Sequence, residues 1–146
     1  LEISVIIGES FNCWKKLERS ISKSNKKINI LHNVKNLSQI LKKYDLAITA
    51  GGMTSLELAC VGIPSIIICG EKFEIETAKL LEKNKCGINL GFGKNISSKQ
   101  ISEYVNNLIL NFEQRKQMRR QGKKLIDGNG VIRMEKMIKK LKPSYV

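Results

Sequence analysis

The sequence alternates short apolar runs, rich in β-branched residues, with segments in which apolar residues recur every three or four positions. This alternation is typical of a parallel sheet with helices on its faces. It predicts five strands, over residues 1–7, 28–31, 46–50, 65–69 and 86–90. Because no internal repeat and no long linker interrupts the pattern, we expect one doubly wound, Rossmann-like α/β domain over residues 1–146.

The helical segments carry start and stop signals. A helix is predicted over residues 54–61, with Gly62 and Pro64 ending it. The clearest helix follows Ser97 or Ser98, either of which can cap its start. Its predicted buried stripe is Ile101, Val105, Leu108, Ile109 and Phe112. Before it, Gly91 and Gly93 are expected to end the fifth strand.

The high positive charge of the chain raises the question of an anionic partner. The chain has a net charge of +13, and the segment from Glu113 to Lys142, with eleven basic and three acidic residues, contributes +8 of it. Aromatic residues make up 5% of the chain and do not alternate with the basic ones as a base-stacking surface requires. The pattern therefore argues against a dedicated nucleic-acid binder and favours solvated helix faces, with contact to an anionic membrane surface as a further reading.

Cysteine and histidine give little sign of metal chemistry. The four cysteines form no C-x-x-C pair and His32 is the only histidine, so we expect no metal site and no cofactor. His32 is read as a structural residue at a strand end. Cys60 and Cys69 stand among apolar residues and are read as small core residues of a reduced, cytoplasmic protein.

The most informative junction follows the third predicted strand, where a double glycine leads into a helix. Gly51 and Gly52 let the backbone turn sharply and let an anion come close, and a helix start offers free N–H groups to a phosphate. A second reading is purely structural: Thr54 and Glu57 have the spacing of a capping box. From the residues alone, both readings stay open.

Residues 44–68, YDLAITAGGMTSLELACVGIPSIII, resemble the central motif in the C-terminal half of GT-B nucleotide-sugar enzymes. The segment is most similar to PseG hydrolases, which release an altrose-type sugar from UDP on the way to pseudaminic acid, and it is also similar to MurG transferases. The order of motifs from Val5 to Gly130 follows the PseG-like pattern over most of the chain.

The resemblance implies roles for individual residues. Those of the turn, Gly51, Gly52, Met53, Thr54 and Ser55, would cradle the UDP phosphates. Glu57 would bind the ribose hydroxyls, and the backbone around Val34 would read uracil. No catalytic residue is expected in this chain, because the family's N-terminal half supplies the catalytic histidine.

Two departures from the family pattern affect the expectation. PseG-like sequences usually carry Asn-Gln where this chain has Phe73 and Glu74. Glu74, with its neighbours Glu71 and Glu76, either contacts sugar hydroxyls or complements the dipole of its helix. In addition, the resemblance leads us to expect that the chain begins one strand late for this family and is without the family's N-terminal half.

We therefore expect the UDP-sugar-binding domain of a PseG-like hydrolase that acts in polysaccharide or pseudaminic-acid-type sugar synthesis. Its expected partners are a UDP-sugar and an N-terminal domain, without which we expect no activity. One alternative is the donor-binding domain of a MurG-like glycosyltransferase. Another is a non-catalytic domain that binds anions or nucleic acid.

Overall fold

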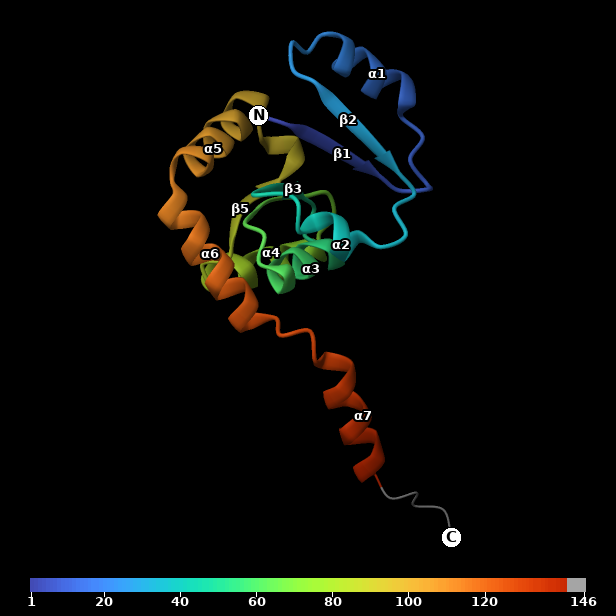
Figure 1. The fold of residues 1–146 in the computed structure, drawn as a ribbon, viewed down its shortest axis with the longest axis vertical. Coiled ribbons are helices and arrows are strands. Elements are labelled where there is room, and N and C mark those ends of the chain that lie inside the picture. Colours follow the sequence, from blue (N-terminus) through green and yellow to red (C-terminus); the bar gives the residue numbers. More distant parts are fainter. Residues whose placement is uncertain (142–146) are drawn as a thin grey trace. The chain divides into compact units, whose positions relative to one another are not determined.

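The computed structural model describes residues 1–141, and the chain divides into two compact units (Figure 1). The first is Leu1–Leu37 and the second begins at Ser38. The described strands form two parallel sheets, one of two strands and one of three, in place of a single continuous sheet. That residues 1–146 make one domain stays a prediction.

The first unit is a strand–helix–strand element. Strand β1 (Ile3–Ile7) pairs in parallel with β2 (Ile28–His32), and α1 (Trp14–Ser22) connects them. A helical connection is what parallel neighbours require. The ring of Trp14 makes an edge contact with that of His32, at 5.2 Å between centroids, so His32 packs against an aromatic side chain as its structural reading expects.

The second unit has strands in the order β3-β4-β5, all parallel. A short helix, α2 (Leu37–Leu41), spans the boundary between the units. The strands, helices and one 3₁₀ turn that follow are β3 (Ala47–Thr49), α3 (Met53–Val61), β4 (Ser65–Cys69), α4 (Glu74–Lys83), β5 (Gly87–Phe92), η1 (Gly93–Asn95), α5 (Ser98–Leu110), α6 (Phe112–Leu125) and α7 (Gly130–Lys140).

Strand β4 is the centre of the core. Ile67 lies in a cluster with Ala59 of α3 and Leu81 of α4, whereas Ile66, on the other face, packs with Leu108 of α5. Ile66 and Ile67 are both fully buried. Helices thus cover both faces of the strand, which explains its uninterrupted apolar run and confirms the predicted Rossmann-like layering.

Helices α3 and α6 approach each other closely. A Cβ on Gly122 would lie 2.7 Å from the carbonyl oxygen of Ala59, so only glycine fits there. One turn earlier on α6, Nε of Arg119 donates to the carbonyl of Gly62 at 3.0 Å. Gly62 ends α3 in the left-handed conformation, with φ of 84°, as the sequence predicts.

The predicted cap of α5 is confirmed at Ser97. Its hydroxyl accepts the backbone N–H of Gln100 at 3.2 Å, and the Gln100 side chain accepts the backbone N–H of Ser97 at 2.9 Å. The predicted buried stripe of this helix is wrong at Ile109, which is 37% exposed, and at Phe112, which is 63% exposed. The helix ends at Leu110, and Asn111 caps the start of α6 through a bond from the N–H of Gln114, so the helical periodicity is broken there.

The end of the fifth strand also differs from the prediction. Gly91 does not end β5, which continues to Phe92. Gly91 instead sits within the strand at φ of 78°, next to an irregularity in the pairing with β4. Gly93 begins the following 3₁₀ turn, in agreement with the prediction.

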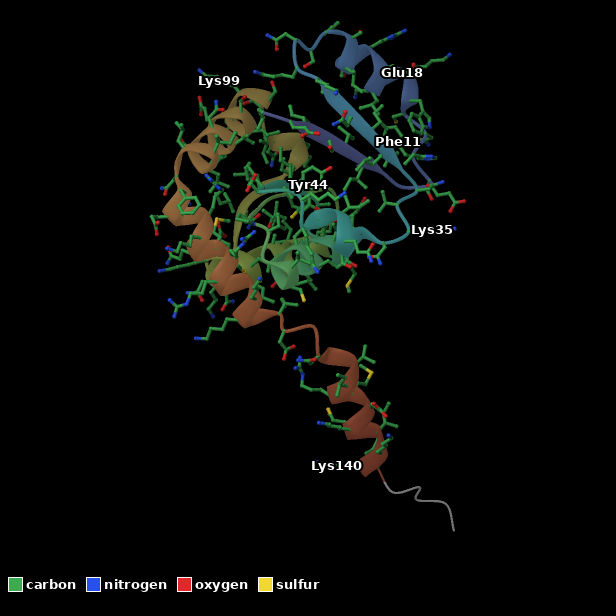
Figure 2. The ribbon with its side chains drawn as sticks, viewed as in Figure 1. Phe11, Glu18, Lys35, Tyr44, Lys99 and Lys140 are labelled. Carbon is green, nitrogen blue, oxygen red and sulfur yellow. The ribbon has the colours of Figure 1, made fainter. Side chains whose placement is uncertain are left out.

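The basic segment from Glu113 to Lys142, here called the basic tail, contains nearly all of α6 and the whole of α7. Helix α6 buries Met118 and Gly122, whereas α7 buries none of its residues. The side chains along α7, with Lys140 labelled, are drawn in Figure 2. Lys142 lies outside the described residues. Over residues 1–141, no helix is both long and apolar enough to cross a membrane.

Candidate functional site

The turn between β3 and α3 holds two glycines in different situations. Gly51 is buried, and a Cβ there would lie 2.5 Å from the carbonyl oxygen of Glu74, so packing alone requires this glycine. Gly52 has an ordinary extended backbone, with φ of −82°, and a Cβ there would meet one atom, Oε1 of Glu74, at 3.7 Å. The fold therefore does not need glycine at position 52, and the space beside it is open to a ligand.

The capping-box reading of this turn is wrong. Gly52 is the N-cap of α3, and no side chain caps the helix start. Thr54 is therefore too far along the helix to act as N-cap. The Ser55 side chain is fully buried and donates to the carbonyl of Gly52 at 2.6 Å, so it fixes the turn. The first N–H groups of α3 are left without a side-chain acceptor, which suits an anion.

The other predicted residues of this turn lie at the same end of α3. Met53 is 74% exposed, and Thr54 is half-buried. Glu57, one turn further, is exposed and accepts no hydrogen bond from residues 1–141. Its carboxylate is free to accept hydrogen bonds from a ligand's hydroxyl groups.

The turn from β4 to α4 brings a second carboxylate to this place. Glu74 is 9% exposed, and its Oε2 accepts the backbone N–H of Gly70 at 2.7 Å and that of Glu71 at 3.2 Å. Burial raises the pKa of the neighbouring Cys69 thiol, and the negative charge of Glu74 adds to the shift. The structure thus places Glu74, a sequence-predicted site residue, directly beside the glycine turn.

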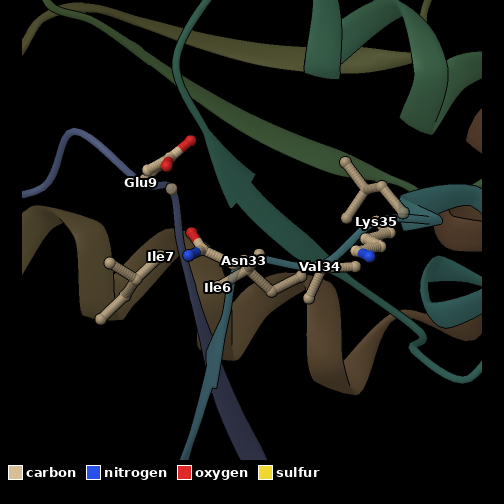
Figure 3. Close-up of a pocket in the computed structure, with 8 residues that line it drawn as sticks. Ile6, Ile7, Glu9, Asn33, Val34 and Lys35 are labelled. Atoms are coloured by element: carbon tan, nitrogen blue, oxygen red, sulfur yellow. The ribbon is translucent and has the colours of Figure 1, made fainter.

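Val34, the residue predicted to mark the base-reading loop, lines an open pocket within the first unit (Figure 3). The pocket lies where β1 and β2 end, and the N–H of Asn33 ties these two ends together through a bond to the carbonyl of Ile7 at 3.1 Å. The other lining residues, which the sequence analysis did not single out, are Ile6, Ile7, Gly8, Glu9, Asn33, Lys35 and Leu37. Apolar walls with polar groups at the rim suit a flat heterocycle. The signal that could have found these residues is their position directly after two parallel strands.

Part of the basic tail has structural partners. Arg115 donates to the carbonyls of Leu108 and Ile109 at the end of α5, and Arg119 donates to Gly62 at the end of α3. A cation at a helix C-terminus complements its dipole. These two arginines therefore stabilise the ends of α5 and α3.

Comparison with known proteins gives the family and the fold of the chain. The chain is 23% identical over 112 residues to the spore coat polysaccharide biosynthesis protein SpsG of Bacillus subtilis. This match covers 77% of this chain and 33% of SpsG. The fold is similar to that of MurG from Acinetobacter baumannii, with a TM-score of 0.75 and 15% identity over 96% of this chain and 41% of MurG.

The spinosyn forosaminyltransferase SpnP has a similar fold as well, with a TM-score of 0.64 and 15% identity over 95% of this chain and 44% of SpnP. The chain thus spans about a third of the length of SpsG and about two fifths of the two solved structures. These likenesses confirm the predicted α/β fold, which is that of the C-terminal domain of GT-B glycosyltransferases such as MurG. The sequence pattern of the glycosyltransferase family 28 C-terminal domain matches residues 1–130, and the chain belongs to that family.

Proposed function

We propose that this chain is the part of a glycosyltransferase-type enzyme that binds a UDP-sugar donor. The observation that carries the proposal is the uncapped start of α3 behind Gly52, a glycine that the packing of the protein does not require. A diphosphate there would receive backbone N–H groups and the positive end of the helix dipole. Membership of the family 28 C-terminal domain supports the same ligand class.

The predicted residues of the glycine turn and Glu57 then have roles. Gly52, Met53 and Thr54 offer backbone N–H groups to the phosphates, while Gly51 and Ser55 hold the turn in shape. The exposed carboxylate of Glu57 accepts hydrogen bonds from ribose hydroxyls. That the backbone around Val34, in the first unit, reads uracil stays a prediction of the family resemblance.

The reaction that we propose is transfer of the sugar to an acceptor. The names of MurG and SpnP and the family itself are those of glycosyltransferases, whereas the PseG-like hydrolysis expected from the sequence finds no support in these comparisons. In either reaction, the start of α3 would stabilise the negative charge that builds on the departing UDP. The general base would come from another part of the enzyme.

The partners of the site follow from the relatives. SpsG and MurG are two to three times as long as this chain, so we propose that an N-terminal domain completes the cleft and that the reaction needs it. The name of SpsG supports a place in polysaccharide synthesis. A cytoplasmic location also belongs to this proposal.

Contact with an anionic membrane surface stays a prediction of the basic tail. Exposed apolar side chains along α7, among them Val131 and Met137, and four cationic ones support it. Co-sedimentation with vesicles tests it. We expect binding to vesicles that contain an acidic phospholipid, and loss of that binding at 0.5 M salt, where the Debye length is about 4 Å compared with about 30 Å at 0.01 M. Equal binding to neutral vesicles would contradict the electrostatic part.

Calorimetric titration of UDP tests the proposed function. We expect binding to the wild-type chain, loss of binding in Gly52→Val, and about tenfold weaker binding in Glu57→Gln. Glu113→Gln is the matched control, because Glu113 is an exposed carboxylate at the start of α6, and it should bind UDP like the wild type.

A single-stranded RNA of increasing length is the comparison ligand. If the chain shows no affinity for UDP at millimolar concentration but binds RNA more tightly with length and with a steep salt dependence, the nucleic-acid alternative is correct and the proposal fails. Binding of neither ligand would also contradict it.

A further inference from the structure

We infer that Glu74 makes the anion site at the start of α3 selective: it disfavours a bare phosphate and admits a phosphate ester whose attached group donates a hydrogen bond. This inference rests on the proposed function and specifies which nucleotide the site prefers. It concerns the second unit alone, where both the carboxylate and the glycine turn lie.

The Glu74 side chain is held in place. It is 9% exposed, and Oε2 accepts two backbone N–H groups, those of Gly70 and Glu71. Its backbone and Cβ also pack against Gly51, where a Cβ would lie 2.8 Å from the Cβ of Glu74. Because of these contacts, the carboxylate cannot turn away from the site when a ligand arrives.

The second oxygen is directed at the site. Oε1 lies 3.7 Å from where a Cβ on Gly52 would be, next to the residue that caps α3. Within residues 1–141 this oxygen has no hydrogen-bond partner. The carboxylate of Glu74 is thus anchored through Oε2. It presents Oε1, as an unused acceptor, to the space in which a ligand would meet the first N–H groups of α3.

The chemistry of the two groups sets the preference. The helix start attracts an anion, but a carboxylate a few ångströms away repels it, and the repulsion grows with the charge of the ligand. Terminal phosphates, as in pyrophosphate or UDP, carry more charge than the diester of a nucleotide sugar and offer Oε1 no donor. A sugar hydroxyl or amide N–H beside the diester can donate to Oε1, and this hydrogen bond offsets the repulsion between the carboxylate and the phosphates.

The test compares three probes, pyrophosphate, UDP and UDP-N-acetylglucosamine, on the whole 146-residue chain with Glu74 intact and as Glu74→Gln. Glutamine keeps an acceptor for the N–H groups of Gly70 and Glu71, so the variant is expected to fold, and circular dichroism checks this. Glu82→Gln is the control, since Glu82 is an exposed carboxylate further along the same helix.

We expect Glu74→Gln to bind pyrophosphate and UDP about fivefold more tightly than the wild type and to lose most of the preference for the sugar nucleotide. The control should keep the wild-type preference. A folded Glu74→Gln variant whose affinity for pyrophosphate and UDP equals that of the wild type overturns the inference.

The outcome is separable from that of the proposed function. If neither nucleotide binds but Glu74→Gln still gains affinity for pyrophosphate, the repulsion of a bare phosphate by Glu74 stands, whereas the UDP-sugar proposal and the preference for a phosphate ester fail. If both nucleotides bind to the wild type but the variant keeps the preference for the sugar nucleotide, the proposal stands and the inference fails.

Discussion

Gly51 and Glu74 are 23 positions apart in the sequence, yet a Cβ on Gly51 would lie 2.5 Å from the carbonyl oxygen of Glu74. The contact joins the turns that follow two neighbouring parallel strands. It gives Gly51 a packing role and leaves Gly52, its neighbour, as the glycine whose presence the fold itself does not explain.

The two glycines should therefore respond differently to alanine. Gly51→Ala forces a methyl group against backbone atoms that cannot move alone, so it should lower the free energy of unfolding by about 1–3 kcal/mol. Gly52→Ala should change it by less than about 1 kcal/mol, because its backbone and surroundings accept a Cβ. Urea unfolding followed by circular dichroism measures both, and equal losses would contradict the assignment.

Gly122 should be equally intolerant. Alanine is the better helix former by about 1 kcal/mol, but a Cβ at position 122 would lie 2.7 Å from the backbone oxygen of Ala59. We expect Gly122→Ala to destabilise the protein by about 1–3 kcal/mol. Gly130→Ala is the matched control, since no atom lies within 4 Å of a Cβ there; it should be neutral or stabilising. A stable Gly122→Ala variant would show that α3 and α6 are packed less closely.

Acid should weaken the junction between α6 and α7. The hydrogen bond from Arg133, at 2.6 Å, lowers the pKa of Asp127 to about 2, assisted by the backbone N–H of Asn129. The pKa is lowered in the folded state, so the contribution of this pair is present above the unfolded pKa of about 3.9 and is lost as the pH falls towards 2.

Carboxyl NMR titration checks that value. In Arg133→Gln the pKa of Asp127 should rise most of the way to about 3.9. Lys139→Gln, which removes the separate 2.6 Å pair with Glu135, should leave it at about 2. An unchanged Asp127 in Arg133→Gln would contradict the assignment.

The cap of α5 gives a prediction about stability. Ser97→Ala removes the acceptor of the Gln100 N–H and should cost about 1 kcal/mol of unfolding free energy. Ser98→Ala, one residue later inside the helix, should cost less than about 0.5 kcal/mol. Thermal unfolding of the pair measures the difference, and the same midpoint for both would count against the capping box.

Local patterns in the sequence were sufficient for the elements of the fold. The β-branched run at residues 65–69 predicted β4, because a strand covered on both faces must be apolar throughout. Ser97 and Gly62 marked the ends of their helices through hydrogen bonds and backbone angles that depend on near neighbours. Phe112 was misplaced because helical period alone does not register the cap that Asn111 provides to the next helix.

What the tertiary structure decided is which polar groups meet. The sequence favoured the glycine turn and named Glu74 as a candidate, but it also offered a capping box at Thr54 and gave both glycines one role. Only the packing of the β4–α4 turn against the β3–α3 turn separates Gly51 from Gly52 and brings the Glu74 carboxylate to the start of α3. Periodicity and caps are set by residues a few positions apart, whereas the site depends on distances between strand ends that only the assembled sheet fixes.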